Sequence, residues 1–385
     1  MDNKISNDLN EIFEYSVKIR RKLHMYPEIG FDLEKTVALV KSELEKMGIE
    51  YTEKYGKSSV VAQIGSGEKI IAFRADMDAL PINENADVPF ASKIPGRMHA
   101  CGHDSHTAVL LGVAKYLKMV EDKLNLRVRL IFQPSEESVN SGGKMLTENG
   151  VMEGVSHILA AHCDNDIESG TLGICPGDFI AACTVVDIKF FGRSSHVGLP
   201  QNGIDAIAMA NDAYIKIKKE VSKIMGDSPY VWSVGKISGG TSHNIISDFC
   251  EMNVSFRYYN SDIAERVKTA VFEISNSVAD DFGGKVEIEW NNVCLPIHND
   301  EEITRNFKKI AEENGIPTEK APIRLTSEDF CWYVNEKPGT FFRFGTRNEA
   351  LGCTYPVHSP DFKLDENGMK SALKAFVSYA LAFEN

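Results

Sequence analysis

Short apolar runs along the chain predict buried β-strands. Residues 69–73, 127–132 and 156–161 are rich in Val, Ile, Leu and Phe. Each run is too short for a helix, and polar or proline-containing sequence follows each one. Strands of this kind, apolar along their whole length, are typical of a sheet that is covered on both faces.

A helical pattern lies between the first two of these runs. Apolar residues recur at spacings of three and four from Val109 to Val120, and Asp104 or Ser105 can cap a helix at its start. Strands that alternate with helices favour an α/β fold, in which a mostly parallel sheet is flanked by helices.

Acidic and imidazole side chains follow the predicted strands. Asp76 and Asp78 come after the first run, Glu136 and Glu137 after the second, and His162 directly after the third. The carboxyl ends of parallel strands meet at one edge, where open α/β sheets bind their ligands. We therefore expect these residues to converge there.

The pattern changes between about residues 184 and 289. Strands are predicted at residues 184–191, 230–237, 249–258 and 285–290, and helices at residues 204–225 and 263–279. The order β-α-β-β-α-β is that of a ferredoxin-like α+β unit. Because His358, another residue of metal-binding type, lies beyond this unit, we interpret it as an insertion. The expected division is one domain in residues 1–183 and 295–385, ending in a helix near residues 365–383, and an inserted domain in residues 184–294.

Composition and charge exclude several classes of function. The 385 residues carry a formal net charge of −13, and no Lys/Arg cluster offsets it, which argues against a nucleic-acid partner. No apolar run approaches the roughly 20 residues of a membrane span, so no membrane partner is expected. The eight cysteines are scattered singly and do not resemble a disulfide framework. These observations predict a cytoplasmic enzyme.

Residues suited to metal binding occur at four separate places. Cys101, His103, Glu137, His162 and His358 together offer the thiolate, imidazole and carboxylate ligands that a divalent transition metal prefers, and five are enough for two ions. The ligand types do not distinguish Zn, Mn, Co or Ni. Glu136 remains as a carboxylate beside the site, which indicates catalysis, because a base must accept the proton of an activated water.

Each of these residues also has a structural interpretation. Cys101 can be a buried thiol beside a capping loop, and adjacent Glu136 and Glu137 can be a solvated pair. His162 after an apolar run can be a core histidine, and His358 before Ser-Pro can mark a turn. The residues alone leave both interpretations open.

Several motifs in matching order resemble the M20 metallopeptidase family. They are Arg74-Ala-Asp-Met-Asp-Ala-Leu-Pro81, Met98-His-Ala-Cys-Gly-His-Asp-Ser-His-Thr107, Gln133-Pro-Ser-Glu-Glu137, Gly192-Arg-Ser-Ser-His196, Asn202-Gly-Ile-Asp-Ala206, Ser327-Glu-Asp-Phe330 and His358-Ser-Pro-Asp-Phe362. They resemble most its amidohydrolase branch of hippurate hydrolases, plant auxin-conjugate hydrolases and N-acetyldiaminopimelate deacetylases. The resemblance implies a di-metal catalytic domain, and an inserted lid through which the chain forms a homodimer or higher homo-oligomer.

The resemblance also implies a role for each matching residue of the catalytic domain. It makes Cys101, His103, Glu137, His162 and His358 the ligands of two divalent metal ions. Glu136 becomes the general base that activates the metal-bound water and later protonates the leaving amine. Asp78 is expected to orient His103 or another ligand and not to bind metal itself.

Three lid residues gain roles from the same resemblance. His196 corresponds to an imidazole that faces the developing oxyanion, often from the partner subunit. Asn244 and Arg257 correspond to residues that bind the free carboxylate of the substrate. From the residues alone, Arg257 can equally be a solvated strand residue. Ser247 stands where Pro is commoner in the branch, and Ser194-Ser195 stand where Gly is commoner.

A second departure from the branch concerns the segment after His162. Asp164, Asp166 and Glu168 lie where apolar or aromatic residues are usual, and such acids near the site would favour a cationic substrate. A solvated surface loop is the alternative. Arg343 can bind an anionic group or pair with one of these acids.

The predicted activity is metal-dependent hydrolysis of the amide bond of small N-acyl amino acids. A dipeptidase or a broad aminoacylase of the same family is the alternative within this class. A non-catalytic relative that binds metal or ligand is the alternative from another class, and the presence of Glu136 and all five ligands argues against it.

Overall fold

The structure is a computed structural model that describes residues 3–138 and 140–382, with side chains from residue 8 onward. It divides into two compact units, which are described separately. Unit 1 comprises residues 1–177, 298–322 and 329–385, and unit 2 comprises residues 178–297 and 323–328. Within the described residues, no helix combines the length and the apolar character needed to cross a membrane.

Unit 1 is built on a sheet with the strand order β1-β2-β4-β3-β5-β16-β6-β15. Its strands are β1 (Tyr51–Thr52), β2 (Val60–Ile64), β3 (Ile70–Asp76), β4 (Arg127–Gln133), β5 (Val155–Glu168), β6 (Leu172–Ile174), β15 (Thr318–Lys320) and β16 (Gly339–Arg347). The four central strands, β4, β3, β5 and β16, are mutually parallel. The predicted α/β fold with a largely parallel sheet is confirmed.

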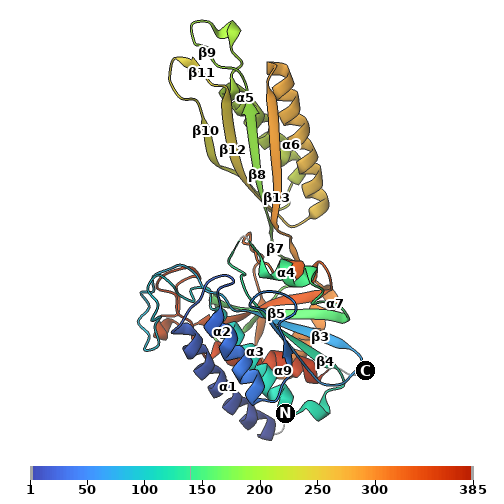
Figure 1. Cartoon of the computed structure of the whole chain (residues 1–385). Coiled ribbons are helices and arrows are strands. Elements are labelled where there is room, and N and C mark those ends of the chain that lie inside the picture. Colours follow the sequence, from blue (N-terminus) through green and yellow to red (C-terminus); the bar gives the residue numbers. More distant parts are fainter. Residues whose placement is uncertain (1–2, 139, 383–385) are drawn as a thin grey trace. The chain divides into compact units, whose positions relative to one another are not determined.

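Helices cover both faces of this sheet. They are α1 (Asn3–His24), α2 (Glu34–Lys46), α3 (His103–Met119), α4 (Gly142–Glu148), α7 (Glu301–Glu313), α8 (Cys331–Val334) and α9 (Gly368–Leu381), with short 3₁₀ turns η1 (Glu121–Lys123) and η3 (Glu349–Leu351). Helices α1, α2, α3 and α9 lie on one side of the strands in Figure 1. Helix α3 packs on the sheet beside α9.

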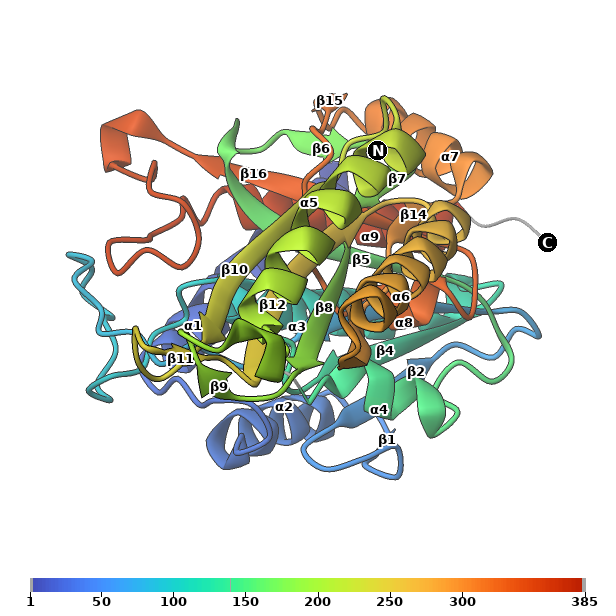
Figure 2. The ribbon, with the colours of Figure 1, turned by 90° about the horizontal axis from the view of Figure 1, so that it is seen from above.

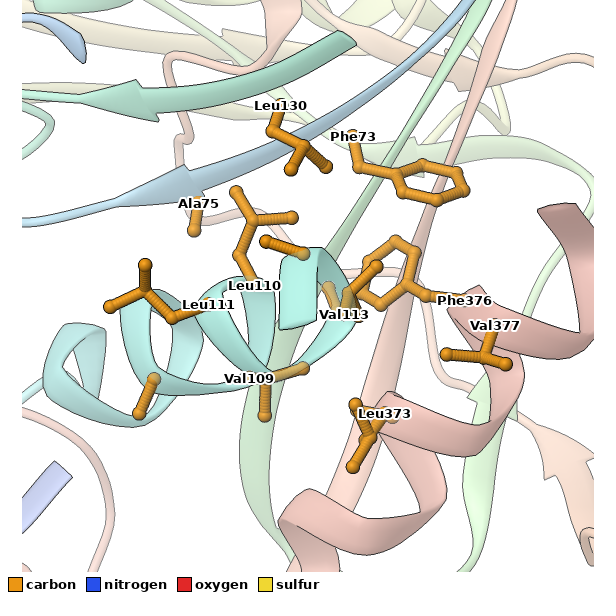
Figure 3. Packing of buried hydrophobic residues seen from close by; sticks show 14 of the residues in the cluster. Phe73, Ala75, Val109, Leu110, Leu111, Val113, Leu130, Leu373, Phe376 and Val377 are labelled. Atoms are coloured by element: carbon orange, nitrogen blue, oxygen red, sulfur yellow. The ribbon is translucent and has the colours of Figure 1, made fainter. Parts of the chain in front are cut away.

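The main core of unit 1 lies between this sheet and helices α3 and α9. Figure 3 shows side chains of α3, such as Leu110 and Val113, directed toward Phe73 of β3 and Phe376 of α9. The rings of Phe73 and Phe376 lie 4.8 Å apart, and all four side chains are almost fully buried. Burial of an apolar side chain of this size stabilises the fold by roughly 1.5–3 kcal/mol.

Unit 2 is a four-stranded antiparallel sheet with two helices on one face. Its main elements are β8 (Ala182–Phe191), α5 (Ala206–Met225), β10 (Val231–Gly239), β12 (Phe249–Tyr258), α6 (Ser261–Phe282) and β13 (Lys285–Cys294). The strand order β10-β12-β8-β13 and the side-by-side helices α5 and α6 (Figure 2) are those of the predicted ferredoxin-like unit. Smaller elements are β9 (Ser195–His196), η2 (Pro200–Asn202) and β11 (Ile245–Ile246). Two further strands, β7 (Gly177–Ile180) and β14 (Ile297–Asn299), pair where the chain passes between the units.

Two local predictions are wrong. Helix α3 begins at His103 with Gly102 at its N-cap, so Asp104 and Ser105 lie inside the first turn and do not cap it. Strand β5 does not end at residue 161 but runs to Glu168, because β16 pairs along its whole second half. The acidic segment that follows His162 is therefore part of a strand and not a loop.

Candidate active site

The carboxyl ends of the parallel strands collect most of the predicted site residues. Strand β3 ends at Asp76 and is followed by Asp78, and β4 leads into the loop that carries Glu136 and Glu137. His162 lies within β5, next to β3 in the sheet. The parallel order of the strands therefore brings together side chains that are far apart in the sequence.

Cys101 and His103 reach the same place through a turn that requires glycine. Gly102 has a φ of 80°, in the left-handed region that other residues avoid. A Cβ atom at this position would also lie only 2.4 Å from the sulfur of Cys163. Gly102 is thus the residue that allows a thiol and an imidazole to enter the site from one turn.

His358 lies next to this turn. Its N–H donates to the carbonyl of Ala100 at 2.8 Å, which holds the loop after η3 beside the Cys101 segment. Its φ of 66° is unusual for a residue other than glycine. Backbone strain of this kind is commonest at functional sites.

Side chains of metal-binding type form overlapping groups, and within each group the candidate ligand atoms lie within 4.8 Å of one another. The groups include Cys101 with His103 and His162, Cys101 with Glu137 and His358, and His103 with Glu136 and Glu137. All five predicted ligands therefore occur in groups that share members, as expected of a site with two neighbouring ions.

His162 is oriented by a backbone hydrogen bond. Its Nδ1 donates to the carbonyl of Cys163 at 2.7 Å, so its Nε2 carries the lone pair and lies 3.3 Å from the Sγ of Cys101. Burial and the charges of His106 and Arg343 hold the pKa of His162 well below its usual range. The imidazole is therefore neutral, which is the form that binds a metal.

His103 lies among carboxylates without a hydrogen bond to any of them. Its Nε2 is 3.8 Å from Asp76 and 3.9 Å from both Glu136 and Glu137. Its Nδ1 is 3.6 Å from Asp78, and within the described residues neither ring nitrogen has a hydrogen-bond partner. Burial alone would lower the pKa of His103, but these carboxylates, Asp76 foremost, raise it to about 10. The cluster thus favours positive charge at its centre.

Asp78 holds the middle of the loop that carries the two glutamates. Its two carboxylate oxygens accept the backbone N–H groups of Glu136 at 2.9 Å and of Glu137 at 3.1 Å. The Oε1 atom of Glu137 lies 3.2 Å from Nε2 of His358. Asp78 therefore lies between the imidazole of His103 and the glutamate loop, and contacts both.

The sequence interpretation missed a buried pair beside this cluster. Asp76 accepts a hydrogen bond from Nδ1 of His106 at 2.6 Å and pairs with Arg74 at 2.7 Å. The Nε2 atom of His106 accepts the N–H of Cys163 at 3.0 Å. His103 and His106 stand three residues apart on one helix, and this spacing was the available signal that both rings face the site.

Asp104 also makes buried contacts outside its own helix. It is fully buried, and it pairs with Arg20 at 3.1 Å and with His24 at 2.8 Å. These contacts attach helix α1 to the first turn of α3. Asp104 therefore stabilises the segment that carries Cys101 and His103.

Unit 2 brings together two of the three predicted lid residues. His196 of β9 pairs with Ile245 of β11, directly after Asn244, and both predicted residues are exposed. Arg257 lies near the other end of β12, eight residues beyond Phe249, which corresponds to about 26 Å of extended strand. Within the described residues, Nη1 of Arg257 is buried and has no hydrogen-bond partner.

The acidic residues of β5 are not equivalent. Asp164 is buried and accepts the N–H of Asp166 at 2.9 Å, whereas Asp166 and Glu168 are exposed. Arg343 of β16 is in register with His162, and its guanidinium stacks on Phe341 at 5.3 Å. The strand geometry therefore places Arg343, and not the exposed acids, beside the metal-binding cluster.

Comparison with known proteins agrees with this site. The profile of Peptidase family M20/M25/M40 matches residues 72–382. Thermostable carboxypeptidase 1 of Saccharolobus solfataricus is 36% identical over 99% of this chain and 98% of its own length. An N-acetyl-L-cysteine deacetylase of Bacillus subtilis is 34% identical over 95% of this chain and 87% of its own length.

A solved structure has the same fold along nearly the whole chain. It is the YXEP protein of Bacillus subtilis, described as a dinuclear metal binding peptidase of the M20 family. It is 32% identical, covers 97% of this chain and 98% of its own, and superimposes with a TM-score of 0.85. The chain therefore belongs to peptidase family M20/M25/M40 and is a metal-dependent hydrolase.

Proposed function

We propose that this protein hydrolyses the amide bond of N-acyl amino acids, with two divalent metal ions held by Cys101, His103, Glu137, His162 and His358. The observation that carries the proposal is the cluster of these side chains, in which Cys101, His103 and His162 are buried, Glu137 is partly buried and His358 is exposed, with Glu136 beside it. The name of one relative supports the substrate class, since that protein is a deacetylase of an N-acetyl amino acid.

The residues present fit two metal ions. The nitrogens of His103 lack hydrogen-bond partners among the described residues and lie 3.6–3.9 Å from four carboxylates. Ligands that share one ion at 2.0–2.3 Å are separated by about 3–4 Å. Burial and the nearby carboxylates of Glu137 and Glu136 raise the pKa of the Cys101 thiol well above its usual range, so a bound cation would be needed to stabilise the thiolate. The cluster thus has the spacing and the charge of a cation site.

We assign the proton transfers to Glu136. When bound, divalent ions would lower the pKa of a water molecule and polarise the substrate carbonyl. Glu136 accepts the proton of the attacking water and then donates it to the leaving amine. Its backbone N–H donates to Asp78, and its carboxylate lies 3.9 Å from Nε2 of His103. Glu137, its neighbour, is directed toward His358 and is assigned to the metal.

We assign substrate recognition to unit 2 as a lid. His196 stabilises the oxyanion of the tetrahedral intermediate, and Asn244 and Arg257 bind the free carboxylate of the substrate. Since Arg257 lies at the opposite end of the sheet from the other two, we propose that His196 and Asn244 act in the site of a partner subunit. One carboxylate could then contact groups from both chains.

Several features of unit 2 support a homodimer formed through it. Strand β10 is an edge strand, exposed along most of its length, which offers unpaired backbone groups to a second chain. Large apolar side chains are exposed around it, including Val197, Leu199, Ile237 and Ile245.

All eight cysteines are free thiols, which supports a reducing compartment such as the cytoplasm.

A dipeptidase or carboxypeptidase activity is the second candidate, favoured by the name of the carboxypeptidase relative. Purified protein should be assayed against N-acyl amino acids and dipeptides that share one carboxyl-terminal residue. We expect N-acyl amino acids to have the higher kcat/KM. A higher value for dipeptides would favour the second candidate.

Metal dependence tests both candidates. Chelation should abolish hydrolysis, and Zn, Mn, Co or Ni should restore it. Full activity in protein that elemental analysis shows to be free of metal would exclude the proposed site.

A further inference from the structure

The segment Ser327–Phe330 has no role in the site described so far, yet it contributes a buried carboxylate close to it. We propose that Asp329 is a positioning residue, which fixes both ends of the loop that carries Glu136 and Glu137. The importance of this loop for catalysis rests on the proposed function, whereas the attachment of the loop by Asp329 does not.

The contacts of Asp329 define a clamp on this loop. Gln133 is the last residue of β4, and its Nε2 donates to the two oxygens of Asp329 at 2.9 and 2.8 Å. Ser141 is the N-cap of α4, and its hydroxyl donates to Oδ2 at 2.8 Å, as does the N–H of Gly143 at 2.9 Å. The last residue of β4 and the first residues of α4 therefore bind the same carboxylate. Both ends of the loop between β4 and α4 are held in place by these contacts.

An ion pair with Arg74 holds the carboxylate of Asp329 in the interior of unit 1. Nη2 of Arg74 pairs with Asp329 at 2.7 Å, and its Nη1 pairs with Asp76 at 2.7 Å. The Nε atom of Arg74 donates to Gln133 at 2.8 Å. Arg74, Asp76, Asp329 and Gln133 are each at most 2% exposed. A buried carboxylate with this many donors has one favourable position, because moving it would leave charges unpaired in a low-dielectric interior.

Two glycines make the close approach of the loop ends feasible. A Cβ atom on Gly143 would lie 2.7 Å from the carbonyl oxygen of Asp329 and 3.0 Å from its carboxylate. A Cβ atom on Gly142 would lie 1.8 Å from the carbonyl oxygen of Pro134. A side chain at position 143 would push α4 away from Asp329, and one at position 142 would collide with the backbone of Pro134 at the start of the loop. Gly143 is thus an independent sign that α4 begins against this carboxylate, and Gly142 allows the two ends of the loop to meet.

The clamp and Asp78 together determine where the glutamates lie. Asp329 holds the ends of the loop, and Asp78 holds its middle through the N–H groups of Glu136 and Glu137. A catalytic base displaced by about 1 Å can lose about 10²-fold in rate. Removal of the clamp should therefore lower kcat, and leave the recognition of substrate by other residues largely unchanged.

The test compares Asp329→Asn with wild-type protein by hydrogen–deuterium exchange and by kinetics. Asn keeps the volume but loses one acceptor and the charge opposite Arg74. We expect exchange of the backbone amides at residues 135–138 to accelerate about 10-fold or more, because local opening becomes easier, with little change elsewhere in unit 1. In the same variant kcat should fall about 10-fold or more, with KM within about twofold.

Asp365→Asn is the matched control. Asp365 is 5% exposed in the same unit and accepts hydrogen bonds from the side chain of Asn348 and the N–H of Asn367, away from the cluster. The Asp365→Asn variant should loosen its own neighbourhood and leave both the amides at residues 135–138 and kcat unchanged. Ser141→Ala is a milder second variant if Asp329→Asn does not fold, since it removes one donor of the clamp. It should accelerate exchange at residues 135–138 as well as at the start of α4.

Unchanged exchange at residues 135–138 in the foldable variant overturns the clamp. A uniform acceleration across unit 1 also overturns it, since that would make Asp329 a general stabilising group. If wild-type protein hydrolyses no N-acyl amino acid or peptide, the proposed function fails, but the exchange comparison still decides the clamp.

Discussion

In unit 1, the residues assigned to the metal come from four segments and lie within a few ångströms of one another, mostly buried. In unit 2, His196 and Asn244 are exposed at one end of a sheet, and Arg257 lies near the other end. The comparison shows that the first unit brings its candidate ligands into one cluster within a single chain. The groups of the second unit lie apart, so under the proposed function they act together only with substrate or a second subunit.

The largest expected effect concerns the buried cluster of unit 1. Glu136→Gln keeps the shape of the side chain but cannot accept a proton, so kcat should fall by about 10²–10⁴-fold. Its metal content, measured by elemental analysis, should match wild type, because Glu136 is assigned to proton transfer. Loss of metal from this variant would instead show that Glu136 is a ligand, and that the roles of the two glutamates are exchanged.

His196→Ala tests whether unit 2 acts across a dimer. Loss of one group that stabilises the oxyanion should lower kcat by about 10²–10³-fold. When His196→Ala and Glu136→Gln chains are co-expressed, mixed dimers should regain part of the activity, since one site would contain both intact residues. The two variants expressed separately are the controls. No recovery in verified mixed dimers would mean that His196 serves the site of its own chain.

Arg257→Ala should have a smaller effect, confined to recognition. A charged hydrogen bond contributes about 1.5–3 kcal/mol, so kcat/KM for an N-acyl amino acid should fall by about 10–100-fold. Rates for the corresponding amide, which lacks the carboxylate, should change little. Arg266→Ala removes an exposed arginine of α6 and is the matched control. Equal losses for acid and amide would contradict a role in carboxylate binding.

The last expected effect is on the stability of unit 1 in acid and not on the rate of hydrolysis. Burial, and less strongly the charge of Lys69, lower the pKa of His157 from 6.5 to about 4. Since the unfolded chain binds this proton more readily, His157 should stabilise the fold fully above pH 6.5, and this contribution should be lost as the pH falls toward 4. The shift corresponds to about 3 kcal/mol at most.

Urea unfolding at neutral and acidic pH measures this contribution. His157→Gln should reduce the acid-induced loss of stability of unit 1. The same pH dependence in wild type and variant would show that the neutral imidazole of His157 does not stabilise the fold.

Periodicity was sufficient to predict most of the fold. The strand at Phe249–Tyr258 alternates buried and partly exposed residues, and the apolar spacing in α3 is that of a helix, so both could be predicted from local sequence. The start of α3 could not, because it depends on the conformation of Gly102. The end of β5 could not either, because it depends on pairing with β16, far along the chain.

The candidate site was predictable where its residues are chemically distinctive. Cysteine, histidine and paired glutamates after strands made a metal site one of two interpretations, and the resemblance to the M20 family then assigned the ligands. Asp329 was not predictable as part of its surroundings, because its partners Arg74 and Gln133 lie 255 and 196 residues away. The separation of Arg257 from Asn244 could not be predicted from the sequence either, because it follows from the length and direction of β12.

The chain passes between the two units four times, because residues 323–328 belong to unit 2 although the chain before and after them belongs to unit 1. Within unit 2 this short segment is held by backbone bonds, from Ala181 to the carbonyl of Arg324 at 3.1 Å and from Arg324 to that of Phe179 at 3.0 Å. Unit 2 is therefore not formed by one continuous stretch of the chain. Recombination that exchanged only residues 178–297 between relatives would leave a mismatched segment behind, so the two stretches should be inherited, and transplanted, as a pair.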